Sequence, residues 1–246
     1  MSNIFKPTSF KDYPEVVAAL SLRDPDQPGE FSMKTTNATV EVVLANRQRF
    51  AEMLGFDLPR LAVANQNHTD KVHEITDASE QTEAAQADAL ITNTPGWLMG
   101  VTIADCIAIM LYDPAHRAAG VIHSGRRGTA KNITGKTVTA MQQTYKTDPA
   151  KLVAYVSPCP NANEYPIDLE TAKEQDERYI TPGPNKDTVF YDNRAAACDQ
   201  LLAAGLQPEH IQIDERSTIA GRQFHSYRRD HETSGRMLAA IALKKA

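Results

Sequence analysis

The sequence predicts a layered α+β fold with mixed β-sheets. Strand-like runs dominate the middle of the chain, helical periods occur between them at irregular intervals, and a regular alternation of strand and helix is missing. The last observation argues against a doubly wound parallel sheet. Because the 246 residues contain neither a repeat of fixed period nor a Gly/Ser linker, we expect one domain that covers residues 1–246.

Apolar residues at helical spacing predict three helices and a weaker fourth. Val43, Phe50 and Leu54 fall at this spacing in the first helix, and Gly55 is a natural stop. Asp192 is a typical N-cap residue for the third. The helices are expected over residues 39–54, 132–145 and 192–205, and the weaker one over 168–179.

Short apolar and β-branched runs predict strands, of which the last could also be helical. They cover residues 61–64, 89–92, 98–103, 107–112, 120–123, 152–156, 211–213 and 238–243. Residues 180–186 contain Pro182, Gly183 and Pro184 and are expected to form an internal loop.

Composition narrows the class of protein. With 41% hydrophobic and 23% charged residues the chain is an ordinary globular one, and its formal net charge of −5 argues against a protein that coats nucleic acid or anionic lipid. The N-terminus lacks an apolar signal-peptide region, and the apolar stretch 98–112 is interrupted by Asp105. Three widely spaced cysteines suit a reducing compartment. We therefore expect a soluble, cytoplasmic protein without nucleic-acid or membrane partners.

Two histidines and one cysteine stand at predicted strand ends. His68 follows a strand, Cys106 lies between two strands, and His123 ends a strand before a glycine-rich turn. Imidazole and thiolate together suit zinc, and two histidines with one cysteine leave a coordination position for a water whose pKa the metal would lower toward ~7. Copper also binds such a set.

The same residues allow two other interpretations. Cys106 could be a buried free thiol that packs as a small hydrophobe, with both histidines bonded to the backbone. Alternatively, Cys106 could attack as a nucleophile with His68 or His123 as its base, a role that metal binding would exclude at the same moment.

Two polar segments are candidates for binding an anion. The turn 124–129, which begins at Ser124, lets backbone N–H groups face one point ahead of a helix, and Arg127 adds positive charge. Near the C-terminus, Arg228 or Arg229 could hold a phosphate or carboxylate, or the two could belong to a solvated surface ion-pair cluster.

Several ordered motifs resemble those of the YfiH-type, laccase-domain (polyphenol oxidase-like) proteins. Ala104-Asp105-Cys106 resembles that family's Ala-Asp-Cys motif, His123-Ser124-Gly125-Arg126-Arg127-Gly128-Thr129 its His-Ala-Gly-Trp-Arg-Gly-Thr motif, and Gln66-Asn67-His68 its Gln-x-His motif. Residues 88–92, 226–230 and 235–236 also match, and parts of 157–165 match more loosely. The similarity runs from about Phe31 to the C-terminus.

The resemblance implies a single domain with an α-β-β-α layered fold and a zinc ion on His68, Cys106 and His123. It also implies activity on purine nucleosides, namely phosphorolysis of adenosine, inosine or methylthioadenosine and hydrolytic deamination of adenosine. A nucleoside and phosphate would then be the partners. Members of this family have also been described as copper-dependent phenol oxidases and as peptidoglycan-editing factors.

The sequence departs from the family pattern around these ligands. Arg126 replaces the family's Trp, Thr69 the glycine after the Gln-x-His motif, and Pro166 a glutamate. The early Arg-x-Gly-Gly-Val-Ser segment reads Lys34-Thr35-Thr36-Asn37-Ala38-Thr39. The three candidate ligands are thus retained, while the neighbouring residues that are expected to contact the substrate differ from the family pattern.

Within a zinc-dependent nucleoside enzyme, Asp105 and Arg127 are the candidate catalytic residues, and Arg228, Arg229 and Ser124 the candidate anion-binding ones. Asp105 would orient a ligand imidazole or shuttle a proton, and strand alternation favours the first role. The rivals are a copper oxidase of phenols, for which the chain has few histidines, and a non-catalytic binding or regulatory module with structural zinc, for which no fourth ligand is found.

Overall fold

Two six-stranded sheets form the centre of the molecule. The computed structural model describes residues 3–77 and 83–245. The first sheet has the order β1 (Ile4–Phe5), β2 (Val16–Ser21), β15 (Met237–Leu243), β7 (Leu98–Ile103), β3 (Leu61–Asn65) and β5 (Glu83–Gln86). The second has the order β14 (Ile211–Ile213), β10 (Val153–Val156), β8 (Ile107–Asp113), β9 (Ala118–Ser124), β6 (Ala89–Thr92) and β4 (Val72–Glu74). Both sheets mix parallel and antiparallel pairs.

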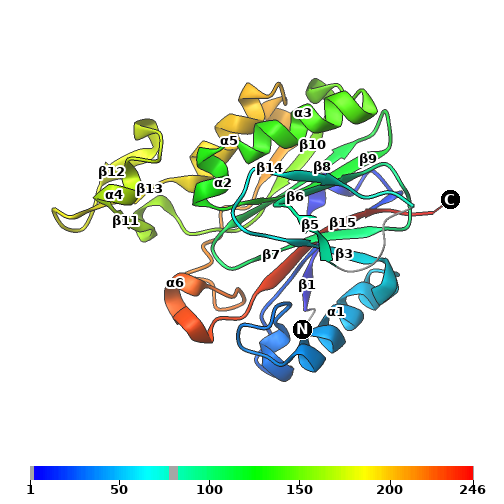
Figure 1. Cartoon of the computed structure of the whole chain (residues 1–246), viewed down its shortest axis with the longest axis horizontal. Helices are drawn as coiled ribbons and strands as arrows, with labels where there is room; N and C mark the ends of the chain where they lie inside the picture. Colours follow the sequence, from blue (N-terminus) through cyan, green and yellow to red (C-terminus); the bar gives the residue numbers. More distant parts are fainter. Residues whose placement is uncertain (1–2, 78–82, 246) are drawn as a thin grey trace.

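Helices cover the outer face of each sheet. α1 (Val40–Met53) packs on the first sheet through an apolar cluster that contains Phe50. α3 (Ile133–Tyr145) and α5 (Asn193–Ala203) pack on the second sheet through another cluster. A third cluster, which contains Met99, fills the space between the sheets. Figure 1 shows the resulting layers, and the predicted layered α+β fold with mixed sheets is confirmed.

Strand β8 illustrates why the sheets appear in the sequence as continuous apolar runs. Ile107 and Ile109 belong to the cluster beneath the helices, while Ala108 and Met110 belong to the cluster between the sheets. A strand that is buried on both faces carries apolar residues at every position rather than at alternate ones.

The three main helices and all the predicted strands are found, with small shifts of their ends. Residues 238–243, which could have been helical, belong to strand β15. This strand pairs with both β2 and β7 inside the first sheet, so the helical alternative is wrong.

The weaker helix predicted over residues 168–179 is wrong. α4 (Leu169–Ala172) ends after one turn, and a separate 3-10 turn follows over Glu177–Tyr179. Asp168 caps the first turn and Asp176 the second by accepting hydrogen bonds from backbone N–H groups, and such local bonds favour separate turns over one continuous helix.

The loop predicted over residues 180–186 is wrong at its start. Ile180–Pro182 forms β12, which pairs with β13 (Thr188–Tyr191), and β13 pairs in turn with β11 (Pro166–Asp168). The prolines did not prevent a strand because β12 lies at the edge of this third sheet. Figure 1 shows the small sheet standing out to the left of the two large ones.

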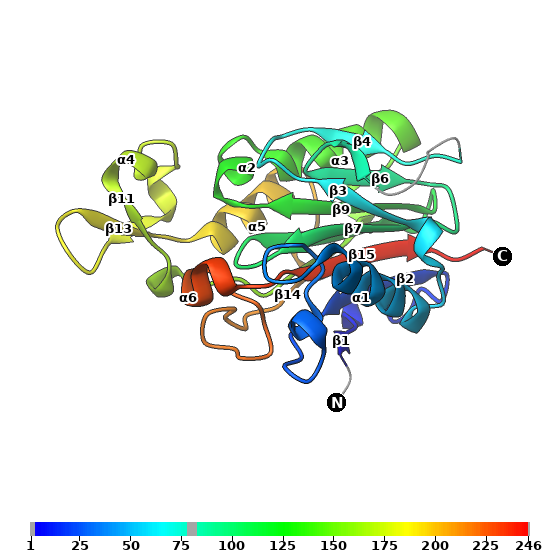
Figure 2. The same cartoon turned by 60° about the horizontal axis from the view of Figure 1, so that its bottom comes forward.

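One end of the two large sheets gathers the polar motifs. β3 runs parallel to β7, and Ile107 at the start of β8 pairs with Ser124 at the end of β9, so the last residues of β3, β7 and β9 meet at this end. α2 (Arg126–Ala130) and α6 (Tyr227–Asp230) lie at the same end (Figure 2). Among the helices of the described residues, none has the length and hydropathy of a membrane span.

Candidate metal centre

Three side chains from distant parts of the chain meet at this end of the sheets. Ligand atoms of His68, Cys106 and His123 lie within 4.8 Å of one another, and residues 3–77 and 83–245 contain no second group of this kind. Cys106 Sγ lies 3.9 Å from His68 Nε2, and the two imidazole centroids are 4.9 Å apart. His123 is buried, whereas His68 is exposed. The trio that the sequence suggested therefore converges on a point that solvent can reach.

Asp88 holds both histidines of this trio. Its carboxylate lies 2.8 Å from His123 Nδ1 and accepts hydrogen bonds from the backbone N–H groups of His68 at 3.1 Å and Thr69 at 2.6 Å. These bonds fix the loop after β3, in which His68 adopts a left-handed φ of 56°. Asp88 rather than Asp105 therefore contacts the imidazole of a candidate ligand, a contact that was one possibility expected for Asp105.

The charges of the trio and Asp88 depend on one another. Burial raises the pKa of the Cys106 thiol, but His123 and His68 outweigh burial and bring that pKa down to about 6. Burial lowers the pKa of His123, but Cys106 and Asp88 reverse this and bring it to about 9. Asp88 is itself buried, yet its bonds from His123 and Thr69 hold its pKa well below the usual range. The sulfur is thus favoured as a thiolate, the form that binds metal.

The donor set and its surroundings fit a divalent metal ion. Because an ionised Asp88 can only accept, Nδ1 of His123 keeps a proton, so Nε2 is the nitrogen that would release its proton and offer a lone pair to a metal ion. Gly125 adds a steric condition, since a Cβ at this position would lie 2.8 Å from Cys106 Sγ and 3.0 Å from His68 Cδ2. A glycine is therefore needed where α2 begins beside the trio.

A cavity of about 660 Å³ opens over the trio. Its remaining lining includes basic and aromatic side chains, namely Lys34, Arg228, His231, Arg236, Tyr165 and Tyr227. The Arg228 guanidinium lies 5.0 Å from the Tyr165 ring centroid, and that of Arg236 lies 5.5 Å from the Tyr227 centroid. The wall that accompanies the metal donors is thus cationic, although the chain as a whole is acidic.

The anion-binding residues expected from the sequence are distributed unevenly around this cavity. Arg228 lines it. Arg127 is exposed on α2. Ser124 is buried, and its hydroxyl is hydrogen-bonded to that of Thr129. Neither residue belongs to the lining of the cavity. Arg229 donates to the carbonyl groups of Thr218, Ile219 and Phe224 and pairs with Asp230, and therefore holds the loop before α6 together.

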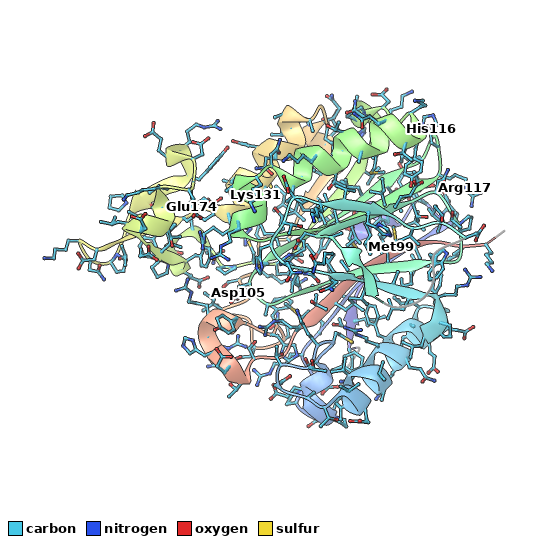
Figure 3. The ribbon with its side chains drawn as sticks, in the orientation of Figure 1. Met99, Asp105, His116, Arg117, Lys131 and Glu174 are labelled. Atoms are coloured by element: carbon cyan, nitrogen blue, oxygen red, sulfur yellow. The ribbon has the colours of Figure 1, made fainter. Side chains whose placement is uncertain are left out.

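Asp105 lies at the turn between β7 and β8 and lines the cavity. Figure 3 places it at the end of the sheets that faces α6, whereas His116 and Arg117 lie at the opposite end. Its carboxylate bonds to Thr218 and to the backbone of Arg228 rather than to an imidazole.

Sequence reasoning assigned no role to Asp88, Lys34 or Arg236, although each stands in a segment compared with the family. Asp88 begins the matching stretch 88–92, and Arg236 ends the matching pair 235–236. Lys34 stands where the early family segment has arginine, so the positive charge is retained at the cavity. These three roles depend on contacts between distant segments, which spacing along the chain does not reveal.

Fold and site together define a class of protein: two packed mixed sheets whose strand ends present an open His-Cys-His donor set beneath a basic cavity. The family model described as multi-copper polyphenol oxidoreductase laccase matches residues 30–244. The chain therefore belongs to this laccase-like, YfiH-type family, as its motifs suggested.

Individual relatives support this assignment. A purine nucleoside phosphorylase of Corynebacterium glutamicum is 29% identical over 210 residues, which span 83% of each chain. The purine nucleoside phosphorylase YlmD of Geobacillus stearothermophilus is 32% identical over 222 residues, 82% of this chain and 79% of the relative. The crystal structure of the hypothetical protein YfiH from Bacillus licheniformis has the same fold, with a TM-score of 0.90, 22% identity, and coverage of 99% of this chain and 97% of that one.

Proposed function

We propose that this chain is a zinc-dependent purine nucleoside phosphorylase. It would cleave adenosine, inosine or methylthioadenosine with inorganic phosphate, and the same site would deaminate adenosine by hydrolysis. The observation that carries the proposal is the open His68–Cys106–His123 trio beneath a cavity of about 660 Å³, a size that suits a nucleoside with phosphate. The names of the two phosphorylase relatives support the choice of reaction.

The cavity offers the two kinds of contact that these substrates need. A purine base can stack on the rings of Tyr165 and Tyr227 or on the arginines that lie over them. Arg228 and Arg236 can form paired, charge-assisted hydrogen bonds with phosphate oxygens.

Phosphorolysis breaks the bond between C1′ of the sugar and the base nitrogen, and forms a bond between C1′ and a phosphate oxygen. The base leaves with the bonding electrons and takes up a proton. The basic wall would hold the hydrogen phosphate dianion, whose proton balances the one that the base takes up, against the sugar, which makes the reaction effectively intramolecular. A zinc ion bound to the trio would act as a Lewis acid that polarises an oxygen of a reactant. Asp88 contributes by keeping the His123 ring in one orientation.

A copper-dependent oxidase of phenols is the second candidate, and the description of the matching family model favours it. A thiolate and two imidazoles can bind copper as well as zinc. However, the trio is the one such cluster in the described residues, whereas multi-copper electron transfer needs several metal sites. Metal analysis of protein purified without added metal separates the candidates, because stoichiometric copper without zinc would favour the oxidase.

A non-catalytic module with a structural metal is the third candidate. Structural zinc usually has four protein ligands. The cluster that the described residues form offers three, and it opens on the cavity, which favours a site with a vacant position.

The test is to incubate zinc-loaded protein with adenosine, inosine and methylthioadenosine, with and without phosphate, and to separate the products by chromatography. We expect free adenine or hypoxanthine only when phosphate is present, and inosine from adenosine without it. His123→Ala should abolish both activities. Absence of turnover of all three nucleosides, or an unchanged rate in His123→Ala, would contradict the proposal.

A further inference from the structure

We propose that Asp105 is a positioning residue that fixes the basic wall of the cavity relative to Cys106. Asp105 immediately precedes Cys106 in the chain and adopts a left-handed φ of 78°. Asparagine and aspartate tolerate this conformation better than other residues with side chains. The kinetic part of the proposal rests on the proposed function, whereas its structural part does not.

Both oxygens of the Asp105 carboxylate are engaged by segments far away in the sequence. Oδ1 accepts a hydrogen bond from Thr218 Oγ1 at 2.6 Å, and Oδ2 accepts one from the backbone N–H of Arg228 at 2.6 Å. Bonds to an ionised acceptor are among the stronger hydrogen bonds in proteins. The carboxylate therefore ties the turn that carries Cys106 to the loop at Thr218 and to the start of α6.

These partners hold the wall of the cavity. Arg228 belongs to α6 and lines the cavity, as do Tyr227, the first residue of α6, and His231, the residue that follows its end. Thr218 is fully buried, and its loop is further fixed by hydrogen bonds from Arg229. The distance between the metal donors and the cationic wall is thus set through one carboxylate.

This role differs from the proton transfer that the position beside a metal ligand suggested. The oxygens of Asp105 already accept two short hydrogen bonds. The imidazole of His123 is hydrogen-bonded to Asp88 and not to Asp105. A proton carrier must ionise, whereas a positioning residue need only keep its hydrogen bonds. Asn and Ala substitutions therefore separate the two roles.

Asp105→Asn keeps the amide oxygen as an acceptor for Arg228 N, and its NH2 group can donate to Thr218 Oγ1. Asp105→Ala removes both bonds, and Thr218→Val removes one while leaving the carboxylate in place. Asp113→Ala is the matched control, because the Asp113 carboxylate, like that of Asp105, accepts backbone N–H at a turn, but it is buried at the opposite end of the sheets.

The experiment measures three quantities on zinc-loaded protein: the Kd of inorganic phosphate by calorimetry, hydrogen exchange of the amides in residues 226–231, and the KM values for phosphate and nucleoside. We expect Asp105→Ala to weaken phosphate binding about tenfold or more and to speed exchange in that segment. Thr218→Val should show a smaller change in the same direction, and Asp105→Asn should stay within about threefold of wild type. KM for phosphate should rise more than KM for the nucleoside, and Asp113→Ala should leave phosphate binding and exchange in that segment unchanged.

Proton transfer predicts a different pattern, in which Asp105→Asn loses kcat as severely as Asp105→Ala and phosphate binding is unchanged in both. That pattern would overturn the proposal, as would wild-type protein that binds no phosphate. If wild type binds phosphate but turns over no nucleoside, the proposed function fails while the expected phosphate and exchange results still support the positioning role. If Asp105→Ala does not fold, the other two variants decide. A smaller loss of phosphate affinity in Asp105→Asn than in Thr218→Val supports the positioning role, and the reverse order overturns it.

Discussion

The Asp88 carboxylate lies 2.8 Å from His123 Nδ1 and also accepts the backbone N–H of His68. One buried side chain thus orients the ring of one candidate metal ligand and the backbone of another. Carboxylates behind metal-bound histidines fix the tautomer and the direction of the ring. Asp88 is therefore central to the geometry of the site, although it would not touch the metal.

Asp88→Asn is expected to lower the affinity for zinc by about 10- to 100-fold. The amide cannot accept with both of its polar atoms, so it cannot serve His123 and the loop of His68 and Thr69 together. Competition titration with a chelator measures the affinity. Asp113→Asn is the control, because Asp113 forms a similar 2.9 Å contact with His116 away from the site. Equal zinc affinity in both variants would show that Asp88 does not organise the site.

Gly125→Ala should weaken metal retention without unfolding the protein. Its Cβ would meet Cys106 Sγ at 2.8 Å and His68 Cδ2 at 3.0 Å, so both donors must shift. Zinc content after dialysis measures the effect, and circular dichroism checks the fold. In the control Gly128→Ala the nearest atom lies at 3.3 Å and belongs to Ile133, so its zinc content should stay near wild type. Full zinc retention in Gly125→Ala would argue against a site at this position.

Arg236→Gln should raise the KM for phosphate by about tenfold or more, because it removes a charged partner of an anion from the cavity wall. Burial lowers the pKa of the Arg236 guanidinium, and the charges of Cys106 and Asp105 oppose this effect. Arg127→Gln provides the comparison, since Arg127 is exposed and outside the lining. Steady-state kinetics with varied phosphate separates the two. A larger effect of Arg127→Gln would place the phosphate at the turn after His123 instead.

His225 should make stability depend on pH. Burial lowers its pKa from 6.5 to about 4, while Glu30 opposes the shift. Between these two pKa values His225 is protonated in the unfolded chain but neutral in the folded chain. The free energy of unfolding therefore decreases as pH falls from about 6.5 to about 4. From pH 7 to 4.5 this amounts to about 2 kcal/mol.

Urea unfolding of wild type and His225→Gln at the two pH values isolates this contribution. Glutamine retains a donor for the Glu30 carbonyl, which His225 Nε2 contacts at 3.2 Å. The stability advantage of wild type should shrink by about 2 kcal/mol on acidification, because other titrating groups cancel in the comparison. A constant difference would show that His225 titrates normally in the folded state.

The sequence was most informative where one segment determines its own structure. The buried runs of β7, β8 and β9 are strongly apolar, and helices α1, α3 and α5 repeat their apolar residues at helical spacing. It was least informative at residues 168–182, where local caps and the pairing of β12 with β13 decide the structure.

In the candidate site, too, some residues could be predicted from the sequence and others could not. His68, Cys106 and His123 could be proposed as ligands because each residue type carries its own metal chemistry at a strand end. Asp88 and Arg236 act through contacts across the fold, so their roles required the structure. Arg229 was expected at an anion site because of its charge, yet its guanidinium is engaged with backbone carbonyls.

Anomalous scattering at the zinc edge from crystals of the zinc-loaded protein would locate the metal ion relative to His68, Cys106 and His123. We expect one peak per chain at about 2.0–2.3 Å from a nitrogen of His68, Cys106 Sγ and a nitrogen of His123, with a fourth position taken by water or phosphate. A peak elsewhere, or a fourth protein side chain that closes the coordination sphere, would show that the trio is not an open zinc site.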